Sequence, residues 1–245
     1  MSRNASKTRP FLTAEWRYLV MLNYVIDPAL IAPLVPAGTE LDVFGGTAFL
    51  SLVGFRFIST KIRGVAIPFH RHFDEVNLRF YVRRCANGEV RRGVVFIQEI
   101  VPRRAIAAIA RWLYHENYRS LPMTHDILHT GARVRAEYTW RMSSQHYLLS
   151  AEANGNPMPL TTGSPQQFIA DHYWGYSTQP GGSTLEYRVD HPSWRVWDAS
   201  RAEFTGDAAL LYGPAFSAVL SRPPDSAFLA DGSPVTVYSG TPLPV

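Results

Sequence analysis

The stretch Glu75-Val-Asn-Leu-Arg-Phe-Tyr-Val82 decides the fold, because its apolar and polar residues alternate strictly. Successive side chains of a strand point to opposite sides, so this pattern predicts a strand with two unlike faces. The apolar face holds Val76, Leu78, Phe80 and Val82, and the polar face holds Glu75, Asn77, Arg79 and Tyr81. Asn87-Gly88 follows as a turn signal, and the apolar run Val94 to Val101 supplies a second strand. We therefore expect an antiparallel hairpin with its apolar face in the core.

Further strands and a few short helices are expected on both sides of this hairpin. The strands are predicted over Trp16–Ile26, Thr47–Ile58, Arg133–Met142, His146–Ala151 and Thr184–Asp190. The helices are predicted over Pro28–Leu34, Arg103–Tyr114, Pro165–Tyr173 and Ala208–Leu220, the last with a break at Gly213-Pro214. Proline at the first helical position, and Asp27 and Ser164 as N-caps, mark two of the helix starts. The fold class is thus mainly β and barrel-like, with a few short α-helices.

Length and composition indicate an ordinary globular protein. The chain has 245 residues, of which 46% are hydrophobic and 18% charged, and its single cysteine cannot form an internal disulfide. A flexible N-terminal arm is expected over residues 1–14 and a single domain over 15–245. The polar, basic start shows no secretory signal, and no apolar run is long enough to cross a membrane, so the expected location is the cytoplasm.

The basic residues are almost all arginine. The net charge is +4, and only Lys7 and Lys61 among the 24 basic residues are lysines. Arginine binds carboxylates and phosphates through a planar fork but does not act as an amine nucleophile. Because these charges are spread along the chain, we expect no nucleic-acid partner. The lack of a long apolar run likewise predicts no membrane partner. Self-association into a homo-oligomer is left open.

Several segments resemble a YqjF-like family of uncharacterised bacterial proteins. They are Asn23-Tyr-Val-Ile-Asp-Pro-Ala-Leu, Leu34-Val-Pro-Ala-Gly-Thr-Glu-Leu, Ser51-Leu-Val-Gly-Phe-Arg-Phe, Ile67-Pro-Phe-His-Arg-His-Phe-Asp-Glu-Val-Asn-Leu-Arg-Phe-Tyr-Val and Tyr187-Arg-Val-Asp-His-Pro-Ser-Trp. The likeness extends from Trp16 onward. The chain is more distantly similar to acetoacetate decarboxylase, and this similarity implies a β-barrel fold around a central pocket.

The decarboxylase resemblance fails at the residue on which that chemistry depends. Acetoacetate decarboxylase attacks its keto acid with a lysine amine of lowered pKa. The matching stretch here is Gln98-Glu-Ile-Val-Pro-Arg-Arg104, which has arginine where the resemblance implies lysine. A guanidinium stays protonated and forms no Schiff base. Lys61 would have to act from a different strand, so Schiff-base decarboxylation is disfavoured.

The polar strand face is the first candidate site. If it lines a central pocket, Arg79 would bind a substrate carboxylate, Glu75 or Glu99 would transfer protons, and Asn77 and Tyr81 would contact the ligand. The alternative is that this face meets solvent, as in many antiparallel sheets. Glu75 and Arg79 lie about 13 Å apart along a strand, so they pair directly only across a bend. Otherwise Glu99 is the expected cross-strand partner of Arg79.

Two other groups are considered. Arg103 and Arg104 follow Glu99 at the start of a predicted helix, where backbone amides favour an anion; Arg103 is taken as a substrate-binding candidate, with solvated arginines as the alternative. His70 and His72 would share one strand face, and His125 and His129 would share one helix face if their segment is helical. These spacings occur by chance among eight histidines and lack a complete ligand set, so no metal or cofactor is predicted. His70 is kept as a substrate-binding candidate.

Two functions from different classes remain. The first is a pocket for a small anionic or carbonyl-bearing ligand, in which Glu75 or Glu99 transfers protons and Arg79 or Arg103 stabilises a carboxylate or enolate. The second is a non-catalytic ligand-binding or interaction protein that uses the same scaffold. Convergence of Glu75, Arg79 and Glu99 on one enclosed cavity, with a perturbed carboxylate, would favour an enzyme. The sequence alone leaves open whether the chain is one.

Overall fold

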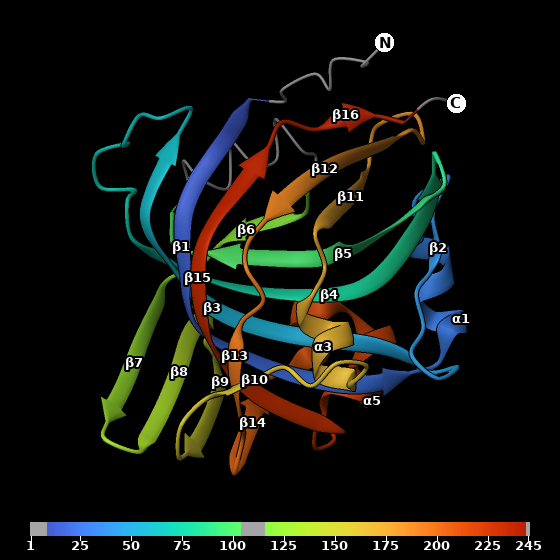
Figure 1. Ribbon diagram of the computed structural model, residues 1–245. Helices are drawn as coiled ribbons and strands as arrows, with labels where there is room; N and C mark the ends of the chain where they lie inside the picture. The colour runs from blue at the N-terminus through green and yellow to red at the C-terminus, as the bar shows by residue number, and fades with distance from the viewer. Residues whose placement is uncertain (1–8, 104–115, 244–245) are drawn as a thin grey trace.

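A large sheet that closes into a ring forms the body of the protein (Figure 1). The structure is a computed structural model, which describes residues 9–103 and 116–243. Pairing runs in the order β15, β1, β3, β4, β5, β11 and β12, and β12 pairs again with β15. The bounds of these strands are β1 Pro10–Ile26, β3 Ala48–Ile62, β4 Phe73–Ala86, β5 Glu89–Val101, β11 Trp174–Thr178, β12 Thr184–Asp190 and β15 Ser226–Tyr238.

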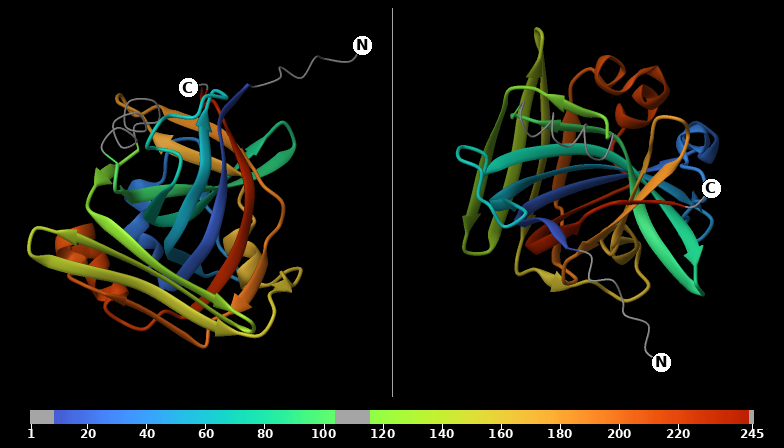
Figure 2. Two further views of the ribbon diagram at one scale, coloured as in Figure 1. Left: turned by 90° about the vertical axis from the view of Figure 1, so that its left-hand side faces the viewer. Right: turned by 90° about the horizontal axis from the view of Figure 1, so that it is seen from above.

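Short strands extend the ring, and a second sheet packs on its outside (Figure 2). The short strands are β2 Glu40–Leu41, β6 Tyr118–Ser120, β10 Met158–Pro159, β13 Arg195–Asp198 and β16 Thr241–Pro242. The second sheet has the order β14, β9, β8, β7, with bounds β14 Arg201–Thr205, β9 Gln145–Asn154, β8 Arg133–Met142 and β7 Met123–Thr130. The expected mainly β class with a few short helices is confirmed.

The expected hairpin is present. Strands β4 and β5 pair antiparallel on both sides of Asn87-Gly88, with Ala86 opposite Glu89 and Val76 opposite Ile100. Val76, Leu78, Phe80 and Val82 are fully buried in the core that the ring shares with the second sheet. Opposite them across this core lie residues of the second sheet such as Tyr138 and Leu149. Alternation along one strand therefore identified the core face correctly.

The inner face of the ring has an apolar core of its own. Met21, Val53 and Phe228 from different strands pack there with Phe168 of α3. Helix α3 (Pro165–Ala170) begins as the sequence predicts, because the Ser164 hydroxyl accepts a hydrogen bond from the backbone N–H of Gln167. Its Phe168, Ile169 and Ala170 are buried in this inner core. The helix thus fills one end of the ring.

The other expected helices lie outside the ring sheet. They are α1 Pro28–Ile31, which continues as a 3-10 turn over Ala32–Leu34, α4 Ala208–Tyr212 and α5 Pro214–Leu220. The break between α4 and α5 falls at Gly213, whose φ of 91° permits the sharp change of direction. The helix expected over Arg103–Tyr114 lies outside the described residues, except for Arg103. Among the described helices, none is both long and apolar enough to cross a membrane.

Three local expectations differ from the structure. Strand β1 already begins at Pro10, pairs with β15 and β3, and buries Phe11 and Ala14, so the expected arm over 1–14 overlaps a paired strand. His70 and His72 lie in the loop between β3 and β4, not on a strand face. His125 and His129 lie on strand β7, not on a helix, because Met123–Thr130 pairs along its whole length with β8.

Candidate functional site

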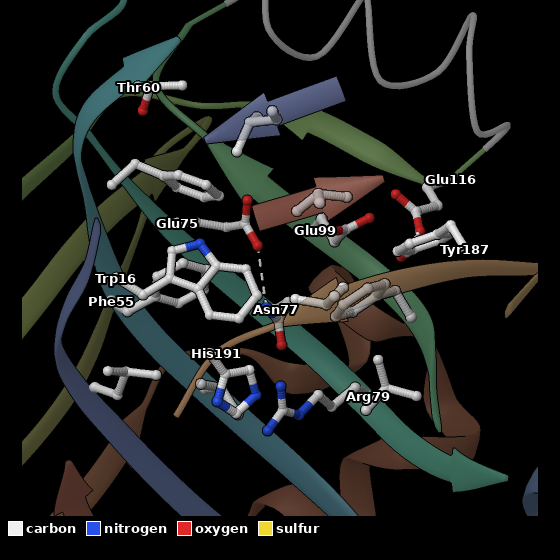
Figure 3. A pocket seen from close by; sticks show the side chains of 18 of the residues that line it. Trp16, Phe55, Thr60, Glu75, Asn77, Arg79, Glu99, Glu116, Tyr187 and His191 are labelled. Carbon is white, nitrogen blue, oxygen red and sulfur yellow. Dashed lines mark hydrogen bonds between the residues drawn. The ribbon is translucent and has the colours of Figure 1, made fainter. Parts of the chain in front are cut away.

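A cavity of about 150 Å³ lies inside the ring, on the side of β4 opposite the second sheet (Figure 3). Its wall is mostly apolar, with Trp16, Phe55 and Phe57 among the aromatic residues that line it. The polar residues that line it are Thr60, His70, Glu75, Asn77, Arg79, Glu99, Glu116, Tyr118, His172, Tyr187 and His191. A cavity of this size accommodates a small organic molecule.

The polar face of β4 lines this cavity. Glu75, Asn77 and Arg79 point into it in sequence along the strand (Figure 3). Only 2% of Glu75 and 8% of Arg79 is exposed to solvent. The alternative that this face meets solvent is therefore wrong, since the ring and α3 enclose the side opposite the second sheet. Charged groups in such surroundings are costly unless they are paired or meet a ligand.

Two further glutamates join Glu75 to form a carboxyl cluster. Glu99 lies on β5 opposite Asn77, and Glu116 precedes β6; both are buried. The Asn77 amide donates a hydrogen bond to Glu75 Oε1 at 3.1 Å, and the Tyr118 hydroxyl donates one to Glu75 Oε2 at 3.3 Å. The Tyr187 hydroxyl donates a hydrogen bond to Glu116 Oε1.

Burial raises the pKa of all three carboxyl groups. The pKa of Glu75 rises to about 8, mainly through burial and despite the hydrogen bond from Asn77. The pKa of Glu116 rises to about 7, again through burial, with the Tyr187 hydrogen bond opposing the rise. Burial, followed by the neighbouring charges of Glu116 and Glu75, raises the pKa of Glu99 well above its ordinary value. The carboxyl cluster therefore retains protons at neutral pH, and its groups gain or lose them at pH values close to neutral.

Arg79 faces the cavity without an ion pair among the described residues. Its side chain rests on the ring of Tyr81, with the guanidinium carbon 5.8 Å from the ring centre. Its buried Nε has no hydrogen-bond partner there. The expected pairing with Glu75 or Glu99 is thus absent. Glu99 lies opposite Asn77, and Arg79 lies opposite Phe96 after a register shift between Leu78 and Arg79. Arg79 lies four residues further along β4 than Glu75, and so apart from the carboxyl cluster.

Two histidines lie beside Arg79 at the same end of the cavity. His172 follows α3, and His191 follows β12 and lies next to Arg79 in Figure 3. Burial lowers the pKa of both imidazoles, and the positive charge of Arg79 lowers each further. Both rings are therefore neutral at pH 7. Of these three side chains, Arg79 carries the positive charge. The cavity has an acidic end and a basic end.

Of the remaining candidates, His70 lines the cavity, whereas Tyr81 and Arg103 do not. Tyr81 does not line the cavity; its hydroxyl is hydrogen-bonded to Ser51 at 2.6 Å and its ring supports Arg79 and His172. Arg103 is exposed and does not line the cavity, and Arg104 lies outside the described residues. His70 lines the cavity from a half-buried position. Within the described ranges, no group of three His, Cys, Asp or Glu residues is placed to hold a metal ion.

Sequence reasoning missed several residues of the site. Glu116, Tyr118, Tyr187 and His172 all line the cavity. Tyr187 lies on a predicted strand, where a check of alternation would have put it with Leu185 and Val189 on one face. Glu116 and His172 lie between regular elements, where periodicity gives no signal.

Comparison with known proteins relates the chain to two groups. A model of the DUF2071 family, described as an uncharacterized conserved protein, matches residues 13–234. The uncharacterized protein YqjF of Bacillus subtilis (strain 168) is 29% identical over 104 residues, which are 42% of this chain and 41% of that protein. The aligned region therefore spans less than half the length of this relative.

Solved structures share the fold. The enduracididine biosynthesis enzyme MppR, complexed with pyruvate, is 15% identical with a TM-score of 0.71, covering 99% of this chain and 93% of its own. An acetoacetate decarboxylase-like enzyme from Sphingomonas wittichii RW1 is 14% identical with a TM-score of 0.65, covering 96% and 93%. Acetoacetate decarboxylase from Legionella pneumophila is 11% identical with a TM-score of 0.65, covering 96% and 87%. Identities this low establish a common fold alone.

Proposed function

Because this chain belongs to the DUF2071 family and has the acetoacetate decarboxylase-like fold, we propose that its cavity binds a small molecule bearing a carboxylate or carbonyl group. One observation carries the proposal: a buried arginine, Arg79, faces a mostly apolar cavity without an ion pair among the described residues. Removing a cation from water is costly unless an anion meets it. A carboxylate accepts the two parallel hydrogen bonds that a guanidinium offers. The structural neighbour MppR is complexed with pyruvate, a molecule of this kind.

The chemistry that suits the opposite end is proton transfer. An ionised carboxylate of the cluster takes a proton from the carbon next to the ligand's carbonyl, and a neighbouring carboxylic acid donates a proton to the carbonyl oxygen. The C–H bond breaks, an O–H bond forms, and a keto group becomes an enol without any other reactant. Groups with a pKa near the working pH serve both roles, as the raised pKa values of Glu75 and Glu116 allow.

A non-catalytic binding protein on the same scaffold is the alternative. It would use Arg79 and the aromatic wall but would have no need for three buried carboxyl groups in one cavity. Such groups are costly to bury, so their convergence with Arg79 favours the enzyme.

Ligand binding is testable by thermal shift. Pyruvate and acetoacetate should raise the melting temperature of the wild type, because a ligand that binds only the folded state adds about 2.7 kcal/mol of stability at 100 times its Kd. Arg79→Met should abolish the shift. Arg83→Met is the matched control, since Arg83 lies four residues along β4 and pairs with Glu40 at the surface. Equal shifts in both variants would exclude Arg79 as the anion-binding residue.

The proposed reaction does not pass through a Schiff base. Lys61 is exposed on β3 and does not line the cavity. The stretch Gln98–Val101, which the decarboxylase resemblance would follow with the reactive lysine, continues with Pro102 and Arg103. Incubation with acetoacetate and borohydride should therefore leave no covalent adduct, as measured by intact-mass spectrometry. A stoichiometric adduct mapped to Lys61 by peptide mass analysis would restore the Schiff-base mechanism.

A further inference from the structure

His172 lies at the basic end of the cavity as a buried imidazole. Its side chain is 2% exposed and lines the cavity. The ring packs against Tyr81, with the ring centres 4.6 Å apart, and meets Phe168 edge-on at 5.4 Å. Neither ring nitrogen has a hydrogen-bond partner among the described residues. A polar group buried in this way is costly unless a ligand or water completes its bonding.

A buried carboxylate stands behind this imidazole. The side chain of Asp42 is fully buried, and its Oδ2 lies 3.8 Å from His172 Nε2. Arg92 Nε lies 2.7 Å from the same oxygen, and Arg92 Nη2 donates a hydrogen bond to Oδ1 at 3.1 Å. The interactions with His172 and Arg92 outweigh burial and lower the pKa of Asp42, so this carboxylate is ionised.

The position of Asp42 selects one tautomer of His172. A carboxylate beside Nε2 favours the proton on that nitrogen, which leaves Nδ1 as a bare acceptor. The groups that face the ring are Asp42 and Arg92 on one side, and Arg79, Tyr81 and His191 around the cavity end. Burial and the two arginines lower the pKa of His172 more than Asp42 raises it, so the ring is neutral and able to accept.

We propose that Asp42 and His172 form a second acid–base centre of the cavity, in which His172 Nδ1 accepts the proton of a ligand hydroxyl while Arg79 binds the adjacent carboxylate. This inference rests on the proposed function, because it uses the same cavity and the same arginine. It narrows the ligand class to acids that carry a hydroxyl next to the carboxylate, such as 2-hydroxy acids and the enols of 2-oxo acids. In the transfer, the ligand O–H bond breaks, an Nδ1–H bond forms, and Asp42 balances the resulting imidazolium.

The tautomer is measurable without a ligand. In ¹⁵N-histidine-labelled protein at pH 7.5, long-range ¹H–¹⁵N spectra should show His172 with a proton on Nε2 and a bare Nδ1. In Asp42→Asn this preference should be lost. A proton on Nδ1, or an imidazolium, in the wild type would overturn the inference. The His129→Gln variant, altered on the second sheet, assists assignment and should leave the His172 signals unchanged.

Affinity separates this inference from the proposed function. Lactate and pyruvate serve as probes, because they differ only in the hydroxyl and keto group. His172→Gln should weaken lactate binding about 10-fold, as for one lost hydrogen bond in a buried site, and pyruvate binding less than 3-fold. Equal weakening of both probes would overturn the role of His172 and leave the carboxylate pocket standing. Failure of both probes to bind the wild type would count against the proposed function, whereas the tautomer would still test the Asp42–His172 pair.

Discussion

Burial in the cavity changes the protonation of its three glutamates from that of exposed glutamates. Glu75, Glu99 and Glu116 are buried beside one another, and each retains its proton to a higher pH than an exposed glutamate. Arg79, by contrast, keeps its charge because a guanidinium does not lose its proton in proteins. The charge of the carboxyl cluster is therefore adjustable by pH, whereas the charge of Arg79 is fixed.

The raised pKa of Glu75 makes the folded state less stable as pH rises. Between the ordinary pKa of 4.5 and about 8, the folded state binds more protons than the unfolded state, so the free energy of unfolding falls with pH. Below pH 4.5 both states are protonated and this cost disappears. Glu75→Gln should therefore gain stability over the wild type at pH 8, on the order of 1 kcal/mol or more, and little at pH 4.5. Urea unfolding at both pH values measures the difference.

The control for that experiment is Glu137→Gln, since Glu137 lies on β8 in the second sheet, away from the cavity. Its stability difference from the wild type should not grow between pH 4.5 and pH 8. A Glu75→Gln variant that loses stability at pH 8 would contradict the burial of a neutral carboxyl group at this position.

At the scale of elements, a bulge between β4 and β5 places the carboxyl cluster. Pairing skips Ile97, so that Phe96 lies opposite Arg79 and Gln98 lies opposite Leu78. Without this skip, strict alternation from Val94 and Phe96 would turn Gln98 to the cavity and Glu99 away from it. With it, Glu99 lines the cavity and Gln98 does not.

This bulge marks the limit of what the sequence predicts. The faces of β4 could be predicted because alternation is a local property of one strand, and the capping residues Asp27 and Ser164 likewise act locally. The cross-strand neighbour of Arg79 could not be predicted, because it depends on a register shift between β4 and β5. Glu116 and His172 enter the cavity from segments between regular elements, so their positions follow from tertiary packing, which no spacing in the sequence encodes.

The ring depends on a close approach between β5 and β11. These strands pair in parallel at Gly93 opposite Trp174, and a Cβ atom at Gly93 would lie 2.6 Å from the Trp174 carbonyl oxygen. Gly93→Ala should therefore force the strands apart and cost about 2 kcal/mol of stability, within the range for overpacking. Val90→Ala, on the exposed part of the same strand, should cost less than about 0.5 kcal/mol. Similar denaturation midpoints for the two variants would show that this contact does not limit ring closure.

At the scale of the whole molecule, two sheets share one apolar core. Residues of β4 and of the second sheet pack in the same cluster, and the Tyr138 hydroxyl donates a hydrogen bond to the Tyr18 carbonyl at 2.7 Å. The cavity lies on the other side of the ring sheet, so the shared core and the cavity lie on opposite faces of the same strands. A single domain over 15–245, a cytoplasmic location, the absence of a nucleic-acid partner and the state of self-association stay predictions.

The shared core predicts cooperative unfolding. Each sheet buries one of its faces against the other, so both should melt in one transition. Calorimetry checks this: the calorimetric and van't Hoff enthalpies should agree. Two resolved transitions, or a ratio of enthalpies well above one, would indicate that the second sheet is an independent unit.

The pairing of β1 with β15 also has a consequence for synthesis on the ribosome. These strands lie side by side from Pro10 opposite Tyr238 to Asn23 opposite Ser226, although they are roughly 200 residues apart in the chain (Figure 1). At about 5–20 residues per second, translation leaves β1 without this partner for roughly 10–40 s. One edge of β1 is unpaired throughout that interval and exposed to other nascent chains. The ring, and with it the cavity, is therefore completed only after β15 has left the ribosomal exit tunnel.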